Sequence, residues 1–199
     1  ALRVTYVGEL GWELYCPTEY GLTLWRTLWE AGRPYDVVAG GYRAIDSLRI
    51  EKGYRVWGAD ITPDETPYEA GLGFCVKLDK DFHGRSALGA APERKRLVCI
   101  ALEDPRSVAL GNEPVRTGEG IVGRVTTGGY GYTLGRSIAY AYVPPDRAEP
   151  GTAVEIDIFG EWIAGVGQLH GNVVATEPRD QLIEGASRWV EAEAAVAPG

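Results

Sequence analysis

The sequence has no methionine, and it has only two histidines and three cysteines among its 199 residues. A structural zinc site is usually built from four cysteine or histidine ligands. With His83 and His170 as the only histidines, and with no C-x-x-C pair, a zinc site lacks ligands, so no metal is expected. The three cysteines are an odd number without a disulfide framework. This pattern favours a reducing compartment, either the cytoplasm or the mitochondrial matrix.

Long apolar runs and excess positive charge are also missing. No run approaches 18 apolar residues, so no transmembrane helix and no membrane partner are expected. The formal net charge of −8 argues against a nucleic-acid partner, because phosphate binding requires a basic face. No signal-peptide pattern is present. The remaining composition is that of a globular protein with room for one large or two small domains.

The stretch from Gly40 to Lys77 organises the first half of the chain. A helix is predicted after Gly40-Gly41, and Gly53 is predicted to end it. Opposite charges at 43, 46 and 49 can pair along this helix. A long loop with several aromatic and proline residues follows, and the apolar run GFCVKL predicts a strand at its end. One helix face is expected to hold Ala44, Ile45, Leu48 and Lys52.

The segments before and after this stretch predict an α+β unit. Alternation in residues 2–7 and 12–16 predicts a β-hairpin, and Thr18 begins a helix that Gly32 ends. A short strand is predicted over 35–39, and a short helix within 81–89. This order of elements is typical of part of a split ferredoxin-like domain over residues 1–89. The small, charged segment 90–95 is predicted to be the domain boundary.

The second half reads as all-β. Short alternating strands are separated by glycine and proline turns, which predicts a small barrel or sandwich over 95–176. Residues 177–199 form a tail in which a terminal helix is predicted. The run GGYGY at 128–132 is predicted to be a glycine-aromatic turn and not a nucleotide loop, because its spacing and context do not fit G-x-G-x-x-G. Cys75 and Cys99 are expected to be small buried residues of strands.

The run GYRAIDSLRIEKGYR, the tryptophan after it and the later segment TPYEAGL resemble the folate-binding region of sarcosine and dimethylglycine dehydrogenases. More distantly, they are similar to the aminomethyltransferase, or T-protein, of the glycine cleavage system. The resemblance covers residues 1 to about 176 and supports a barrel as the C-terminal domain. It implies transfer of a one-carbon unit, released from an N-methyl or aminomethyl amine, to tetrahydrofolate.

The same resemblance implies site residues. In TYVGELGWELY the carboxylate that accepts hydrogen bonds from the pterin edge is implied to be Glu13 and not Glu9. One carboxylate can accept from two adjacent N–H groups, which makes such a contact selective. Tyr6 is implied to cover the ring or donate its hydroxyl. Many T-proteins have an arginine where this sequence has Ile45, so Arg43, two residues earlier, is the candidate to reach a carbonyl or the glutamate tail of folate, or else it pairs with Asp46.

Each candidate also has a structural explanation. Glu13 can be a solvent-facing strand residue and Tyr6 a core residue of the hairpin, while Asp46 and Arg49 are expected to form a structural ion pair. Wall-forming or structural roles are expected for Trp57, Pro67, Tyr68 and Glu69.

The opening of the chain within a strand leads us to expect a fragment or the C-terminal part of a longer polypeptide. By resemblance, the catalytic aspartate lies upstream, so no catalytic residue is assigned here, and an FAD domain would lie further upstream still. The expected partners are folate, a small amine, and either the N-terminal region or a lipoyl carrier protein. The alternative is a non-catalytic folate-binding or assembly fragment.

Overall fold

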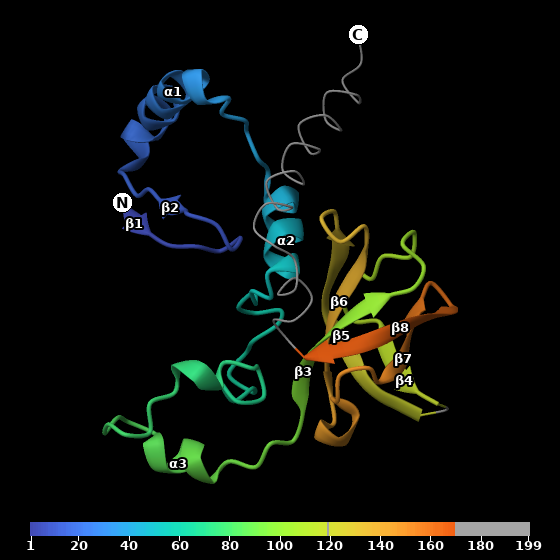
Figure 1. Ribbon diagram of the computed structural model, residues 1–199. Helices are drawn as coiled ribbons and strands as arrows, with labels where there is room; N and C mark the ends of the chain where they lie inside the picture. Colours follow the sequence, from blue (N-terminus) through green and yellow to red (C-terminus); the bar gives the residue numbers. More distant parts are fainter. Residues whose placement is uncertain (119, 170–199) are drawn as a thin grey trace.

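The computed structural model describes residues 1–118 and 120–169, which form a loosely packed first part and a β-barrel (Figure 1). The first part contains a two-stranded antiparallel sheet, three α-helices and three short 3-10 helices. The strands pair Leu2 with Glu13 and Arg3 with Trp12. The elements are β1 (Leu2–Arg3), β2 (Trp12–Glu13), η1 (Thr18–Tyr20), α1 (Gly21–Gly32), η2 (Arg33–Tyr35), α2 (Tyr42–Glu51), η3 (Gly73–Cys75) and α3 (Arg85–Ala90).

The second part is a closed antiparallel barrel with the strand order β3-β6-β5-β4-β7-β8. Closure removes free sheet edges, because β3 pairs with both β6 and β8. Alternate residues point inward, which gives each strand its two-residue period. The strands are β3 (Arg96–Leu102), β4 (Pro114–Thr117), β5 (Gly120–Gly131), β6 (Arg136–Val143), β7 (Ala153–Ile158) and β8 (Glu161–Leu169), with η4 (Pro145–Arg147) between β6 and β7.

Two apolar clusters are buried, one inside the barrel and one on its outer face. The interior is filled by aliphatic side chains such as Ile100, Val125 and Ile156, all at most 1% exposed. The outer cluster joins Ile50 of α2 to side chains of β3 and β6 that point away from the interior. The barrel therefore buries residues on both faces where α2 covers it. The outer cluster consists of Ile50, Leu97, Cys99, Ile138, Tyr140 and Tyr142.

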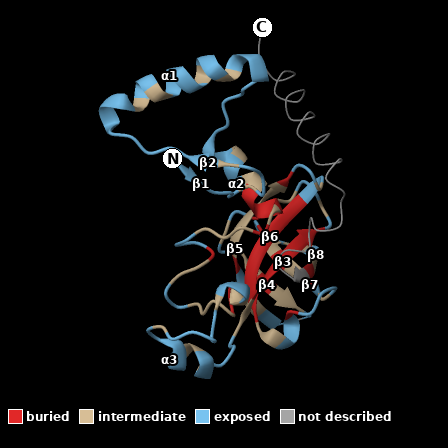
Figure 2. Ribbon diagram, turned by 60° about the vertical axis from the view of Figure 1, so that its left-hand side comes forward, coloured by how far each residue is buried: buried red, intermediate tan, exposed pale blue. Residues whose placement is uncertain are grey.

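The first part is far more exposed than the barrel, as Figure 2 shows by the contrast between pale-blue α1 and the red barrel strands. Helix α1 has no buried residue, although Leu22, Trp25 and Leu28 lie along one stripe. Trp25 and Trp29 stack on each other at 5.9 Å between ring centroids. The apolar stripe therefore forms as predicted, but the described residues do not bury it.

The α+β class with a C-terminal barrel is confirmed, as are the helices predicted after Thr18, after Gly41 and within 81–89. The first hairpin is present, but its strands span only Leu2–Arg3 and Trp12–Glu13 instead of the predicted 2–7 and 12–16. The division into domains at 90–95 stays a prediction. The predicted terminal helix within 177–199 and the part of the second domain after residue 169 lie outside the described residues.

Two predicted strands are wrong. Residues 35–39 form no strand, because Asp36 adopts a left-handed conformation (φ 54°) and the Val37 N–H returns to the Gly32 carbonyl. The run GFCVKL turns instead of extending, since the N–H groups of Cys75 and Val76 bond to Leu72 and Gly73. Cys75 is consequently exposed, whereas Cys99 on β3 is buried as expected. In both runs, short-range turn bonds replaced the pairing with a neighbouring strand that the apolar pattern suggested.

Candidate functional site

Glu13 lies on β2, opposite Leu2, and its side chain is exposed. The Tyr15 hydroxyl donates a hydrogen bond to Oε2 of Glu13, and this bond is the main cause that raises the pKa of Tyr15. The carboxylate keeps acceptor capacity, because each oxygen has two lone pairs and a carboxylate donates nothing when ionised. Glu13 thus presents an acceptor from the edge of a short hairpin, with its orientation fixed by a neighbouring tyrosine.

Tyr6 connects this hairpin to the segment that follows α2. Its hydroxyl donates to the carbonyl of Arg55 at 3.2 Å, and its ring lies 5.9 Å from the ring of Tyr54. The side chain is 37% exposed, so one part of the ring contacts the protein and another part faces solvent. Of the two implied roles, donating the hydroxyl to a ligand competes with this bond, whereas covering a ring does not.

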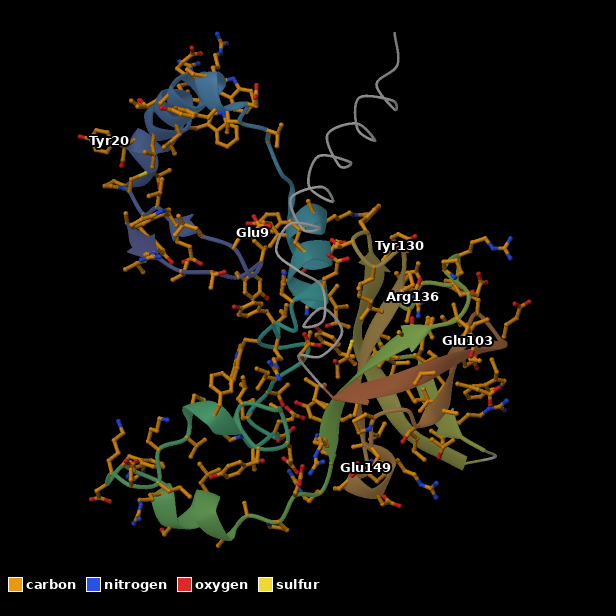
Figure 3. The ribbon with its side chains drawn as sticks, in the orientation of Figure 1. Glu9, Tyr20, Glu103, Tyr130, Arg136 and Glu149 are labelled. Carbon is orange, nitrogen blue, oxygen red and sulfur yellow. The ribbon has the colours of Figure 1, made fainter. Side chains whose placement is uncertain are left out.

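The loop of the hairpin lies beside the C-terminal end of α2, and Figure 3 shows Glu9 there, close to the helix. A Cβ at Gly8 would lie 2.6 Å from Cδ of Lys52, so the loop approaches the lysine stem closely. Gly8 also has a φ of 81°. Lys52 therefore lies on the hairpin side of the C-terminal end of α2.

Arg43 lies near the N-terminal end of α2, on the side of the helix opposite Lys52. The Ser47 hydroxyl donates to the Tyr130 carbonyl at 2.6 Å, and Glu51 accepts from the Thr133 N–H at 2.7 Å. Residues four apart share a helix face, so Arg43, Ser47 and Glu51 lie on the side toward the β5–β6 hairpin. Arg43 is exposed. The structure thus brings Tyr6 and Glu13 onto one hairpin but places Arg43 on the barrel side of α2, and its contact with folate stays a prediction.

A buried ionic network holds α2, the following loop and the barrel together. Arg49 is 2% exposed, and its Nη1 lies 2.8 Å from Oδ2 of Asp60, which is fully buried. The Val56 N–H donates to the same oxygen at 2.9 Å. The hydroxyls of Thr126 and Thr127 on β5 each donate to Oδ1 of Asp60 at 2.5 Å. Asp60 therefore accepts four hydrogen bonds: one from α2, one from its own loop, and two from β5, which lies more than 60 residues later in the sequence.

The predicted ion pair of Asp46 and Arg49 is present, with Oδ1 of Asp46 and Nε of Arg49 3.5 Å apart. Asp46 is a weaker partner of Arg49 than Asp60 is. Sequence reasoning missed Asp60, which gave no signal because its threonine partners lie 66 and 67 residues later. The Tyr142 hydroxyl also donates to the Asp60 carbonyl at 2.9 Å. This cluster is a structural junction between the first part and the barrel.

Glu69, one of the loop residues with an expected wall-forming or structural role, is fully buried and structural. Thr66 and Glu69 form a reciprocal capping box, in which each N–H bonds to the other side chain at 2.9 and 3.1 Å. Arg94 donates to Oε1 of Glu69 through both its N–H and its Nε. Burial opposes ionisation, but these hydrogen bonds outweigh it and lower the pKa of Glu69 to about 2. The T-x-x-E spacing in TPYE was the signal that could have predicted this cap.

Trp57 lies on the loop after α2 and is 70% exposed, so its ring is available to a ligand or another polypeptide. The turn predicted over GGYGY is wrong for its first four residues, because 128–131 are the end of strand β5 and the β5–β6 turn begins only at Tyr132. Among the described residues, no group of three or more metal-binding side chains gathers in one place. Within that same part of the chain, no helix is long and apolar enough to span a membrane.

Comparison with known proteins agrees with this architecture. The model of the GCVT N-terminal domain matches residues 1–80, and that of the glycine cleavage T-protein C-terminal barrel domain matches residues 95–166. The chain belongs to the glycine cleavage T-protein family. A crystal structure of the glycine cleavage system aminomethyltransferase T from Bartonella henselae superposes with a TM-score of 0.75 at 30% identity, covering 86% of this chain and 48% of that protein.

Two human dehydrogenases are also similar. Mitochondrial dimethylglycine dehydrogenase is 38% identical over 183 residues, which is 89% of this chain and 21% of the relative. Mitochondrial sarcosine dehydrogenase is 44% identical over 155 residues, 75% of this chain and 17% of the relative. The chain thus spans about a fifth of the length of these dehydrogenases and about half of the aminomethyltransferase structure. It carries aminomethyltransferase-like domains related to enzymes of both kinds.

Proposed function

We propose that this chain binds tetrahydrofolate and takes part in transferring a one-carbon unit to it from an N-methyl or aminomethyl amine. The proposal is carried by Glu13, an exposed carboxylate on the hairpin of a domain that belongs to the T-protein family. The pterin edge offers an amine and a ring N–H side by side, and an ionised carboxylate accepts from both. The acceptor-only chemistry of Glu13 fits that edge, and the Tyr15 bond orients the carboxylate.

Folate supplies the nitrogen that accepts the one-carbon unit when it is bound, and the residues of this chain bind and orient it. Glu13 holds the pterin edge, and Tyr6 lies on the same hairpin with part of its ring exposed. Orienting the acceptor next to a reactive amine-derived unit favours capture over hydrolysis by water. The amine, and a lipoyl carrier in the aminomethyl version of the reaction, are the partners that this function requires.

The test compares Glu13→Gln with Glu9→Gln, a matched control on the same exposed hairpin. The glutamine places a donor against a donor of the pterin, and a charged hydrogen bond is worth about 1.5–3 kcal/mol. Isothermal titration with tetrahydrofolate should therefore show roughly ten- to hundredfold weaker binding for Glu13→Gln. Glu9→Gln should bind like the wild type. Equal affinities for all three proteins would remove Glu13 from the site.

The alternative is a non-catalytic binding or assembly module, and the apolar surface of the first part favours it. Side chains such as Leu10, Trp12 and Trp25 are 73%, 59% and 55% exposed, and large contiguous apolar patches mark interaction surfaces. A folate-binding chain that shows no one-carbon transfer would support this alternative, when it is supplied with tetrahydrofolate and an aminomethyl donor, which passes on its CH2 unit and releases ammonia without an oxidant. Formation of methylenetetrahydrofolate under those conditions would support the enzymatic function.

A further inference from the structure

Among the described residues, most basic side chains that are buried or half-buried have a carboxylate partner. This is expected, because removing a cation from water is costly unless an anion compensates it. The pairs have N–O distances of 2.6 to 2.8 Å. They are Arg49 with Asp60, Lys95 with Glu65, Arg96 with Glu93, and Arg116 with Glu155.

Two half-buried cations depart from this pattern, and they are only three residues apart. Lys52 and Arg55 form no ion pair with a carboxylate of the described residues. Arg55 donates only to backbone carbonyls, those of Gly53, Ala70 and Gly71, at 2.8, 3.0 and 3.2 Å. These three bonds use three of its five N–H groups. Burial lowers the pKa of Arg55, and the opposing interactions with Tyr140, Tyr142 and Asp60, none of which forms an ion pair with it, offset only part of this effect.

The side chain of Lys52 and the backbone of Arg55 lie where the β1–β2 hairpin meets the rest of the protein. The stem of Lys52 packs against Gly8 in the hairpin loop, and the Arg55 carbonyl accepts the Tyr6 hydroxyl. Glu13 lies five residues beyond Gly8 on the same hairpin. At about 3.3 Å per residue, this separation is at most about 16 Å. An elongated ligand that begins at Glu13 can therefore extend toward Lys52 and Arg55.

We propose that Lys52 and Arg55 form a subsite for the carboxylates of the glutamate tail, at the opposite end of the ligand from Glu13. The inference rests on the proposed function, because it assumes that a pterin edge binds at Glu13. In this subsite, the anionic end of the ligand binds two cations that lack a carboxylate partner within the described part of the chain. Lys52 is the residue to test, because its ammonium makes none of the backbone contacts that tie Arg55 to the loop.

The experiment titrates two ligands into the full chain: tetrahydrofolate and 6-methyltetrahydropterin, a reduced pterin without the tail. Lys52→Gln should weaken tetrahydrofolate binding about three- to tenfold, the lower part of the range for a charged contact because Lys52 is half-exposed. Binding of 6-methyltetrahydropterin should change less than twofold. Lys52→Arg should keep the tetrahydrofolate affinity. Lys80→Gln, an exposed lysine elsewhere, is the matched control and should behave like the wild type.

The outcomes separate this subsite from the proposed function. Equal weakening of both ligands in Lys52→Gln would mean that Lys52 only supports the hairpin, and no weakening of either would remove it from the site. Wild-type protein that binds the two ligands equally well would show that no tail subsite exists. Wild-type protein that binds neither would overturn the folate function itself. The subsite is supported if Lys52→Gln weakens the binding of tetrahydrofolate but not that of 6-methyltetrahydropterin. It is supported further if added salt weakens the binding of tetrahydrofolate to the wild-type protein.

Discussion

The strongest test of the architecture is removal of the Asp60 carboxylate by Asp60→Ala. This carboxylate is fully buried, and it is the only carboxylate within 3 Å of the buried Arg49 guanidinium among the described residues. Removing one partner of a buried ion pair costs about 3–5 kcal/mol, because the remaining charge is left uncompensated. The Val56 N–H and the hydroxyls of Thr126 and Thr127 lose their acceptor as well. We therefore expect Asp60→Ala to lower the free energy of unfolding by an amount in this range.

Urea unfolding followed by far-ultraviolet circular dichroism and by tryptophan fluorescence measures the effect. With a slope of about 2 kcal/mol per molar urea, the midpoint should fall by roughly 1.5–2.5 M. Because Asp60 joins the first part to the barrel, the two probes should no longer coincide in the variant. Arg43→Ala, an exposed position on the same helix, is the control and should change stability by less than about 0.5 kcal/mol.

The double variant Arg49→Met/Asp60→Ala tests the cause. If the uncompensated guanidinium accounts for the loss, removing the charge should recover about 1–3 kcal/mol relative to the sum of the single variants. Two results would refute this reasoning: a cost below about 1 kcal/mol for Asp60→Ala, or strict additivity in the double variant.

Three further predictions follow from single side chains and from the exposed apolar surface. The pKa of Glu69 is lowered from 4.5 to about 2, so its contribution to stability is complete above pH 4.5 and is lost as the pH falls toward 2; acid titration of Glu69→Gln should show a flatter stability profile in that window, and an unchanged profile would contradict the assignment. Phe159 is 91% exposed and has a φ of 54° in a two-residue turn with Gly160, so Phe159→Asn should raise stability by about 1 kcal/mol in thermal unfolding while Phe159→Leu should not. The exposed stripe of α1 should cause concentration-dependent self-association in light scattering that Trp25→Glu reduces, whereas a monomer at all concentrations would contradict it.

The sequence predicted elements wherever the local signals and the final contacts agreed. Gly41 and Gly53 flank α2 as expected, and the alternating runs of the second half became barrel strands. The prediction failed at 35–39 and at GFCVKL, where an apolar run was interpreted as a strand although no strand of residues 1–118 and 120–169 pairs with it. Pattern alone does not reveal which segment lies alongside another, and strand formation depends on that neighbour.

The same limit applies to the candidate site. Tyr6 and Glu13 were correctly assigned to one hairpin, because their separation is short. The side of α2 on which Arg43 lies could not be derived, because it depends on the contacts of Ser47 and Glu51 with residues about 80 positions later. The Arg49–Asp60–Thr126 junction was invisible for the same reason. Long-range polar contacts between ordinary residue types leave no periodic signal in a sequence.

The segment at 90–95 has a consequence for how a ligand would enter. Lys95 pairs with Glu65 at 2.6 Å, Arg94 bonds to Glu69, and the Leu97 N–H bonds to the Glu69 carbonyl at 2.8 Å. Because these bonds hold the connection on both sides, we expect it to be rigid. Movement of the barrel relative to the preceding loop is therefore disfavoured. The β1–β2 hairpin contacts α2 and the segment after it through Gly8 and Tyr6, without an ion pair among the described residues. Under the proposed function, we therefore expect opening and closing around tetrahydrofolate to be a movement of this hairpin relative to a fixed barrel.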